Sequence, residues 1–477
     1  MLFNSFVFAL FLPIIFLLHW YVLKKSKLQQ NSLLLFASYL FYAFWDWRFL
    51  FLLMFSTLLD YTSGLQIATS ANNKKRKIWL WLSIIINLGF LGVFKYYNFF
   101  ISQFAEALTD IGLQINISTL NILLPVGISF YTFHGLSYVF DIYNNKISAE
   151  KNIIDYSLFV SFFPLLVAGP IERATHLLPQ LKKERNFNYV NAVDGLKQIL
   201  WGFFKKIVIA DQCANYVNII FASSVDYAGS TLFVGAFLFA IQIYGDFSGY
   251  SDIAIGTAKL FGIDLLKNFS FPYFSRNIAE FWRRWHISLS SWFRDYLYIP
   301  LGGSRNTMAI TIRNVIIIFV VCGFWHGANF TFIVWGLLNA LFIIPSILHR
   351  TNRNYVEIVG VGKVFPTVNE FLQIFQTFLI TIFCWIFFRA ANLTQAFEII
   401  STIFSSSFFS IPVFSPKILL LLIVFFLIIE WIGREGNYAL ENLFNNKTIK
   451  FFFYYTLIFI ILFFISDDQK EFIYFQF

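Results

Sequence analysis

Residues 315–328 read VIIIFVVCGFWHGA, an apolar run that ends on a histidine between a tryptophan and a glycine. A helix with this composition lies mostly inside a lipid bilayer. An imidazole at that depth loses its hydration, so it must find a partner or take part in chemistry. A neutral imidazole can take a proton from an attacking hydroxyl, as acyl transfer requires. His326 is therefore a candidate catalytic residue, and the alternative is a buried histidine hydrogen-bonded to a neighbouring helix.

The rest of the chain is similarly apolar. Of its 477 residues, 58% are hydrophobic and 13% are charged, whereas a soluble protein carries about 25% charged residues. Apolar stretches that can cross a bilayer core of about 30 Å recur along the sequence. They lie near 5–23, 31–46, 48–68, 78–96, 121–141, 156–170, 196–222, 231–262, 312–327, 328–348, 371–388, 417–433 and 450–466. We predict an all-α polytopic membrane protein with about eleven crossings and one or two re-entrant or interfacial segments.

The net charge of +9 is explained by the membrane and gives no support to a nucleic-acid partner. Lys and Arg concentrate in cytoplasmic loops, and the basic clusters at 24–27 and 74–77 fall on one side if the first three spans alternate. The alternation fails at 171–195, whose basic residues would then be external. A segment at 156–170 that enters the membrane and returns restores the count. Membrane lipids are the expected surroundings.

The domain organisation follows from what the sequence lacks. The longest polar interruptions, 171–195 and 349–370, are too short to hold a soluble catalytic domain. We predict a single integral-membrane domain over 1–477, with a catalytic core at about 240–345. The three cysteines have scattered spacings, and HExxH, CxxC and Gly-rich phosphate motifs are absent from the sequence. The sequence therefore predicts neither a metal site nor nucleotide hydrolysis.

The least lipid-like region contains a second histidine, in the run FWRRWH at 281–286. If 277–292 is one continuous helix, four polar side chains share a face. These are Arg283, His286, Ser290 and Arg294. Such a helix lies at the membrane interface or lines a wet cavity. Its arginines suit the phosphates of a cofactor such as coenzyme A, or alternatively lipid headgroups.

Two carboxylates lie in the run QIYGDFSGYSD at 242–252. Carboxylates in a membrane span are costly and pair with arginine or histidine. Asp246 and Asp252 would either orient an imidazole or form ion pairs with arginines of the 276–284 region, and we favour the ion pairs.

Taken together, these runs resemble the membrane-bound O-acyltransferases, in particular the bacterial branch of alginate and peptidoglycan O-acetylation. The resemblance extends over nearly the whole chain. It is carried by residues 1–5 (MLFNS), 124–131 (LPVGISFY), 168–171 (AGPI), 201–206 (WGFFKK), 246–252 (DFSGYSD), 281–290 (FWRRWHISLS), 296–303 (YLYIPLGG), 323–327 (GFWHG) and 472–477 (FIYFQF).

The resemblance implies a fold of roughly eleven spans around a central tunnel, with His326 at the family's near-universal histidine position. His286 falls on the second active-site position, where it would position or polarise the donor carbonyl. Arg283, Arg284 and Arg294 would bind the donor's phosphates. Asp246, Asp252 and Trp325 would support the site. Leu165 and His134 stand where many relatives have glutamine, a departure that bears on the choice of acceptor.

The function implied is transfer of an acetyl group from a cytoplasmic donor, acetyl-CoA, to a polysaccharide hydroxyl outside a bacterial inner membrane. Transfer would be direct or through a partner extracytoplasmic acetyltransferase, and no permanently bound cofactor is expected. One alternative within the same fold is a D-alanyl transferase for teichoic acid. Another, of a different class, is a transporter or flippase of an acylated intermediate. That class typically shows paired inverted repeats, and the sequence shows none.

Overall fold

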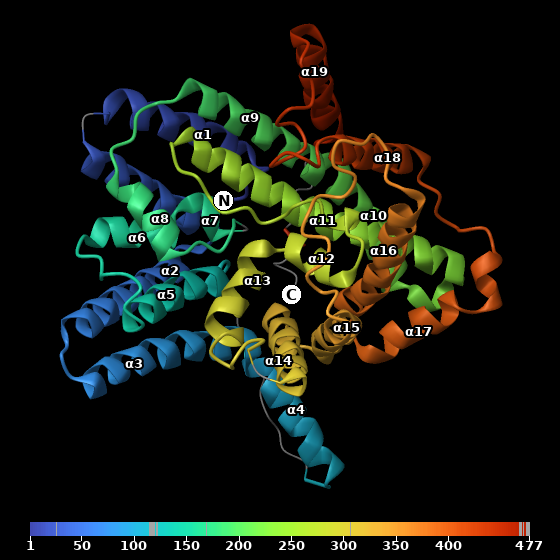
Figure 1. The fold of residues 1–477 in the computed structure, drawn as a ribbon, viewed down its shortest axis with the longest axis horizontal. Helices are drawn as coiled ribbons and strands as arrows, with labels where there is room; N and C mark the ends of the chain where they lie inside the picture. The colour runs from blue at the N-terminus through green and yellow to red at the C-terminus, as the bar shows by residue number, and fades with distance from the viewer. Residues whose placement is uncertain are drawn as a thin grey trace. The chain divides into compact units, whose positions relative to one another are not determined.

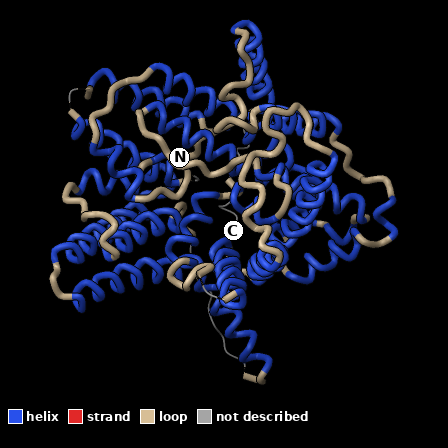
Figure 2. Tube along the Cα trace, in the orientation of Figure 1, coloured by secondary structure: helices blue, strands red, loops and turns tan. Residues whose placement is uncertain are grey.

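The computed structural model describes residues 1–24, 26–113, 120, 123–167, 169–305, 307–466, 470, 472 and 473. Within these ranges the regular secondary structure is helical, and Figure 2 shows helices joined by loops with no strand in the described chain. The all-α prediction is confirmed. Residue 168 of the AGPI run and residues 474–477 of the terminal run lie outside the described residues.

Seven helical segments within the described ranges are long and apolar enough to cross a membrane. They are α2 (Lys27–Thr69), α3 continuing into α4 (Asn73–Asp110), α11 (Gly229–Leu260), α14 (Met308–His326), α15 (Phe330–Leu348), α16 (Val368–Arg389) and α19 (Lys447–Phe464). Two shorter apolar segments are Phe6–Val22 and Ile153–Leu166. The protein is therefore a multi-pass membrane protein, while the number of eleven crossings stays a prediction.

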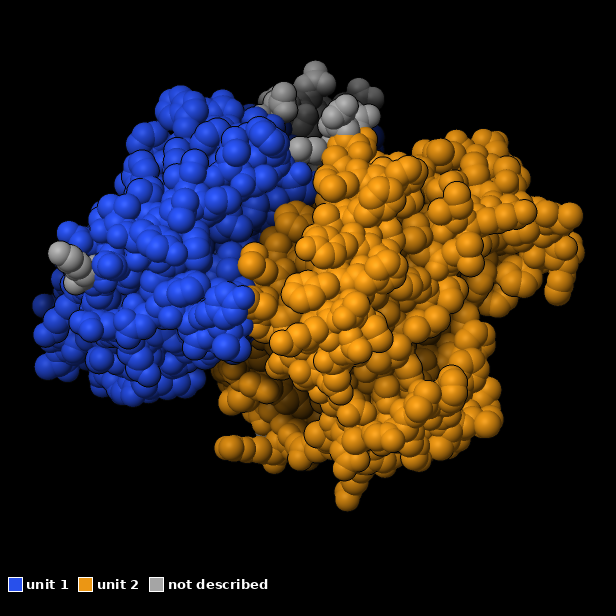
Figure 3. Space-filling model, turned by 90° about the horizontal axis from the view of Figure 1, so that it is seen from above, with its two compact units in different colours: residues 1–192, 257–266 blue, residues 193–256, 267–477 orange. Residues whose placement is uncertain are grey.

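The chain divides into two compact units, coloured separately in Figure 3. Unit 1 comprises Met1–Ala192 and Thr257–Leu266, and unit 2 comprises Val193–Gly256 and Lys267–Phe477. The catalytic core expected at about 240–345 falls mainly in unit 2. The single domain expected from the sequence stays a prediction.

Unit 1 is built around the long helix α2, which packs against α3, α5 and α6. Its other elements are α1 (Phe6–Leu17), η1 (Leu18–Val22), α3 (Asn73–Leu91), η2 (Gly92–Tyr96), α4 (Tyr97–Asp110), α5 (Ile128–Tyr143), α6 (Ile153–Ser161), α7 (Phe163–Leu166) and α8 (Ala174–Lys182). Helix α2 bends at Asp46, whose φ of −157° and ψ of 112° are extended values. The bend divides α2 at the boundary between the spans expected at 31–46 and 48–68.

The stretch expected to enter the membrane and return forms two short helices. Helix α6 has 9 residues and α7 has 4, and a full crossing needs about 20. Both helices are buried within unit 1. Neither is long enough to cross alone, so the re-entrant assignment of 156–170 stays a prediction.

Unit 2 contains the elements that carry the candidate site, whose helices are labelled in Figure 1, although residues 189–192 and 257–260 at the ends of two of these helices belong to unit 1. In addition to α11, α14, α15, α16 and α19, they are α9 (Tyr189–Phe203), η3 (Phe204–Ala210), α10 (Asp211–Ala222), η4 (Ser224–Asp226), η5 (Pro272–Phe274), α12 (Ile278–Arg284), α13 (Ile287–Phe293), η6 (Arg294–Tyr298), α17 (Leu393–Ile403), η7 (Ser406–Phe409) and α18 (Lys417–Ile432). Helices α14 and α15 form a tightly packed hairpin, and α15 also packs on α12 and α16.

Glycines bring helix backbones into direct contact within unit 2. A Cβ atom on Gly202 of α9 would lie 2.6 Å from the carbonyl oxygen of Gly249 of α11. In the hairpin, a Cβ on Gly323 would lie 2.2 Å from the carbonyl oxygen of Phe332. Only glycine permits such approach. The first contact brings α11 against η3, and the second holds the His326 end of α14 against α15.

Candidate active site

His326 is the last residue of α14 and is only 4% exposed. Three aromatic rings surround its imidazole, with centroid distances of 4.8 Å to Trp325, 5.2 Å to Trp335 and 5.2 Å to Phe388. The rings come from α14, α15 and α16. The imidazole therefore lies in the aromatic interior of unit 2, and the glycine contact of the α14–α15 hairpin fixes its position.

Trp325 is the neighbour that the two candidate histidines share. Its ring centroid lies 4.8 Å from that of His326 and 6.4 Å from that of His286. The structure thus places the residues of two separate sequence motifs around one indole. The supporting role of Trp325 stays a prediction.

The prediction of one continuous helix over 277–292 was wrong. Helix α12 ends at Arg284, Trp285 has extended backbone angles, and His286 has a φ of +44° and a ψ of 54°. Few non-glycine residues adopt this left-handed conformation, which is characteristic of functional sites. Because of the break, His286 does not continue the helical face of Arg283.

His286 is buried at 1% exposure and is held by one side chain. Its Nδ1 lies 2.8 Å from Oδ1 of Asn268. Its Nε2 has no hydrogen-bond partner among the residues that the structure describes. Phe247 contacts the ring edge-on at 4.6 Å. Burial lowers the pKa of this imidazole to about 3, so it is neutral at physiological pH.

Arg283 and Arg294 line one cavity of about 600 Å³ in unit 2. Sequence reasoning missed a third arginine, Arg353, which lines the same cavity. The apolar part of its lining includes Val315, Ile318, Phe319 and Cys322 of α14. Cys322 precedes His326 by one helical turn on that helix. The cavity therefore combines cationic side chains with an apolar wall that leads along α14 towards His326.

The structure does not bring Arg284 to this cavity. Arg284 is 8% exposed, and its Nη2 lies 2.8 Å from Oε1 of Glu280. Arg276 pairs with the same carboxylate at 3.0 Å, and Glu280 itself is 0% exposed. The Glu280 carboxylate thus pairs with both guanidiniums, and Arg276 also lies 3.5 Å from the carboxylate of Glu370, so that ion pairs offset part of the cost of desolvating these charges. Arg284 stabilises the turn before His286. Arg283 lines the cavity, and its guanidinium donates to the backbone carbonyls of Asn352 at 2.5 Å and Asn354 at 2.8 Å.

Asp246 and Asp252 form ion pairs, but the predicted arginine partners were wrong. Lys205 Nζ lies 2.5 Å from Asp252, and Lys206 Nζ lies 2.7 Å from Asp246. Both lysines belong to η3, the π-helical segment that follows α9. The glycine contact between α9 and α11 brings these lysines within reach. Asp246 also accepts a hydrogen bond of 2.7 Å from the backbone amide of Ile473.

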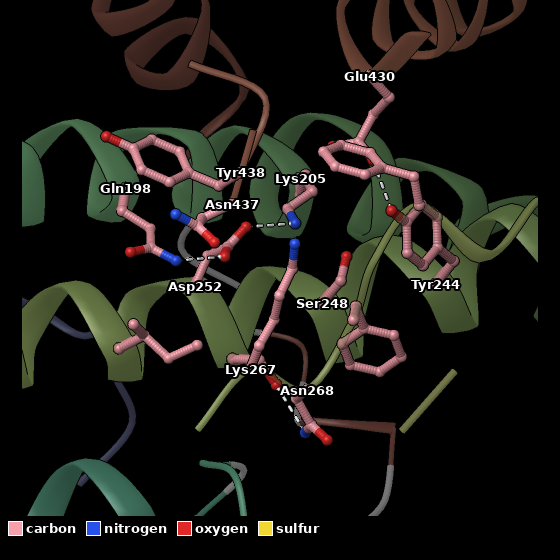
Figure 4. A pocket seen from close by; sticks show the side chains of 14 residues that line it. Gln198, Lys205, Tyr244, Ser248, Asp252, Lys267, Asn268, Glu430, Asn437 and Tyr438 are labelled. Atoms are coloured by element: carbon pink, nitrogen blue, oxygen red, sulfur yellow. Dashed lines mark hydrogen bonds and ion pairs between the residues drawn. The ribbon is translucent and has the colours of Figure 1, made fainter. Parts of the chain in front are cut away.

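Asp252 borders a small polar pocket of about 20 Å³, shown in Figure 4. Gln198 donates to the Asp252 carboxylate at 2.8 Å, while the side chain of Lys267 points into the pocket. Glu430 of α18 accepts hydrogen bonds from Tyr244 at 2.5 Å and from Trp201 at 2.8 Å. The carboxylates are therefore structural partners of buried polar groups, which is the role favoured from the sequence.

Three of these residues had a detectable signal that sequence reasoning did not use. Lys205 and Lys206 interrupt an apolar stretch, and Glu430 does the same in the last third of the chain. A charge in such a stretch calls for a partner of opposite sign. Asn268, by contrast, follows Lys267 in a polar loop, and nothing in its surroundings distinguishes it.

The histidines of unit 1 have structural partners. His134 is fully buried, and its Nε2 accepts a hydrogen bond of 3.0 Å from the amide of Glu172. His176 lies 2.8 Å from the Glu172 carboxylate. His19 is fully buried, with its ring in contact with Trp20, and neither ring nitrogen has a hydrogen-bond partner among the described residues. The hydrogen bonds of His134 and His176 give these two side chains structural roles.

Comparisons with known proteins identify the family of this chain. Residues 145–389 match the family of membrane-bound O-acyltransferases. A probable alginate O-acetylase of Pseudomonas aeruginosa is 40% identical over 407 residues, which cover 85% of this chain and 75% of that protein. A peptidoglycan O-acetyltransferase of Helicobacter pylori is 38% identical over 437 residues, covering 84% of this chain and 79% of that protein. A teichoic acid D-alanyltransferase of Bacillus subtilis is 28% identical over 247 residues, covering 49% and 62%. The chain therefore belongs to the membrane-bound O-acyltransferase family and is a multi-pass membrane O-acyltransferase.

Proposed function

We propose that this protein transfers an acetyl group from cytoplasmic acetyl-CoA to a polysaccharide hydroxyl outside the bacterial inner membrane, directly or through a partner acetyltransferase. The observation that carries the proposal is the cavity of about 600 Å³. It is lined by Arg283, Arg294 and Arg353 and by the apolar side of α14, the helix that ends at His326. Guanidiniums match the phosphates of coenzyme A, and the apolar wall suits the uncharged arm that carries the thioester.

The proposed chemistry needs one base. The imidazole of His326 accepts the proton of the acceptor hydroxyl as the hydroxyl oxygen attacks the thioester carbonyl. The new carbon–oxygen ester bond forms and the carbon–sulfur bond breaks. The proton then passes from His326 to the departing thiolate, so that an alcohol and a thioester become an ester and a thiol. His286, which contacts Trp325 beside His326, helps to position the reactants.

Acetyl is favoured over D-alanyl by the comparisons. The relatives named for O-acetylation match 84–85% of this chain at 38–40% identity. The teichoic acid D-alanyltransferase of Bacillus subtilis matches 49% of it at 28% identity. Membership of an acyltransferase family also counts against a transporter or flippase. The polysaccharide acceptor and the partner acetyltransferase are likewise proposed.

The direct test uses purified protein in detergent with acetyl-CoA carrying a labelled acetyl group. We expect release of free thiol and appearance of the label on an added oligosaccharide, both dependent on the protein. A thioester of D-alanine serves as the competing donor. Thiol release with the D-alanyl donor alone would contradict the acetyl assignment, and binding of an acylated glycan without thiol release would favour transport.

Replacing Arg294 or Arg353 with alanine tests the donor cavity. Both side chains are exposed, so each contact with a phosphate is expected to contribute about 1 kcal/mol. The KM for acetyl-CoA should therefore rise roughly fivefold with kcat nearly unchanged, because the lost contact binds donor and transition state equally. Steady-state thiol release at several salt concentrations measures this. Arg48→Ala, an exposed arginine paired with Asp46 in unit 1, is the matched control. An unchanged KM in both cavity variants would remove the cavity from donor binding.

A further inference from the structure

Two backbone hydrogen bonds join the turn that contains His286 to the loop segment 268–270. The amide of Ser270 donates to the carbonyl of Arg284 at 3.0 Å, and the amide of Ile287 donates to the carbonyl of Asn268 at 2.9 Å. These two backbone bonds lie on either side of His286 in sequence. They fix the distance between the backbones of His286 and Asn268, and they hold the left-handed conformation that interrupts α12 and α13.

The side chain of Asn268 is oriented by three hydrogen bonds and is 0% exposed. Its Nδ2 donates to Oγ of Ser251 at 3.1 Å, and its Oδ1 accepts from Oγ of Ser288 at 3.0 Å. With the amide nitrogen turned towards Ser251, it is the oxygen that faces Nδ1 of His286 at 2.8 Å. A carbonyl oxygen only accepts, so Nδ1 carries the proton of the neutral imidazole.

The other ring nitrogen is left as an acceptor. In this tautomer Nε2 carries a lone pair and no proton. It is buried and has no partner among the described residues. The rings of Phe247, Phe269 and Trp325 contact the imidazole at centroid distances of 4.6 Å, 6.4 Å and 6.4 Å, and none of them donates a hydrogen bond to Nε2. A buried acceptor of this kind calls for a donor, which the described residues do not provide.

We infer that Asn268 is a positioning residue for acyl transfer, which holds His286 so that its Nε2 accepts a hydrogen bond from the reacting hydroxyl group. The inference rests on the proposed function and narrows the role of His286 within it. Polarising the thioester carbonyl would need an N–H at Nε2, and the hydrogen bond to Asn268 places that proton on Nδ1 instead. His286 thus positions the acceptor hydroxyl through this hydrogen bond, and the proton passes to His326, the base, as the hydroxyl oxygen attacks the thioester carbonyl.

Two substitutions at Asn268 test the kinetic consequence. Asn268→Leu removes the acceptor, and kcat should fall about 10–100-fold, as for other residues that orient a functional histidine, with little change in the KM for acetyl-CoA. Asn268→Asp keeps an acceptor for Nδ1–H and should restore most of kcat. Its carboxylate favours the imidazolium and raises the pKa of His286, so the acidic limb of the kcat–pH profile should move to higher pH. If Asn268 had a purely structural role, the substitution Asn268→Asp would leave the acidic limb of the kcat–pH profile at the same pH.

The control is Asn87→Leu, which removes another buried asparagine, bonded to Asp60 in unit 1. It should leave the pH profile unchanged per folded molecule. Wild-type kcat in Asn268→Leu, or an unmoved acidic limb in Asn268→Asp, would overturn the inference.

A measurement independent of activity separates this inference from the proposed function. In protein labelled with ¹⁵N at histidine, the His286 resonances are those lost in His286→Gln. We expect a protonated Nδ1 and an unprotonated Nε2 in the wild type, and loss of this pattern in Asn268→Leu. A protonated Nε2 in the wild type would overturn the inference even if acetyl transfer is observed. Absence of acetyl transfer with the expected tautomer would instead refute the proposed function.

Discussion

Replacing His326 with alanine is expected to lower acetyl transfer by about 10²–10⁴-fold, the range typical for loss of a general base. The residue lies at the end of α14, is 4% exposed and contacts the rings of Trp335 and Phe388. Alanine at this position has no group that can accept the proton of the hydroxyl. The measurement is acetylation in cells, together with thiol release by purified protein, both divided by the amount of folded protein.

The control for this variant is His176→Ala. His176 is partly exposed, lies in unit 1 and pairs with Glu172. It should retain wild-type transfer per folded molecule. Unchanged transfer in His326→Ala, at normal protein levels, would refute the assignment of His326 as the base.

Replacing Glu280 with alanine is expected to have the largest effect on stability. Its carboxylate, fully buried, accepts from the side chains of Arg276 and Arg284 and from the backbone amide of Arg276 at 2.7 Å. Removing it takes from Arg284 the carboxylate with which it pairs and leaves Arg276 with the more distant carboxylate of Glu370, at 3.5 Å. Loss of one partner of a buried ion pair costs about 3–5 kcal/mol. Thermal unfolding in detergent, followed by loss of the monodisperse peak, should show a large decrease in stability.

Glu357→Ala is the matched control for this substitution. The backbone carbonyl of Glu357 accepts from both Arg276 and Arg284, whereas its side chain is exposed. Truncating that side chain keeps the carbonyl and should alter stability by no more than about 0.5 kcal/mol. Equal stability of the two variants would show that the buried carboxylate does not hold this turn together.

The helical fold follows from the sequence because hydrophobic length is a local property. A run such as 315–328 must cross or enter a bilayer whatever its neighbours are. The spans at 312–327 and 328–348 accordingly correspond to α14 and α15. Even the bend of α2 at Asp46 coincides with a boundary between two expected spans, because a charged residue interrupts the apolar run there.

The details of the site depend on contacts that are distant in sequence, and these could not be predicted. The polar face of 277–292 suggested one helix, but His286 adopts a left-handed conformation fixed by bonds to the 268–270 segment. We expected the carboxylates of α11 to pair with arginines. They pair with two lysines instead, because the glycine contact between α9 and α11 places these lysines next to them. The burial of His326 followed from the apolar run around it, whereas its catalytic role stays a prediction.

The contact between Gly202 and Gly249 has a consequence for how this region tolerates change. A Cβ on Gly249 would lie 2.8 Å from the carbonyl of Gly202 and 3.2 Å from the amide of Lys206. Any larger residue would move apart the two helices and, with them, both lysine–aspartate pairs at once. The small size of Gly202 and Gly249 is thus required for both buried lysine–aspartate ion pairs to form. In a comparison of homologous sequences, these glycines and the four charges should be gained and lost as one set.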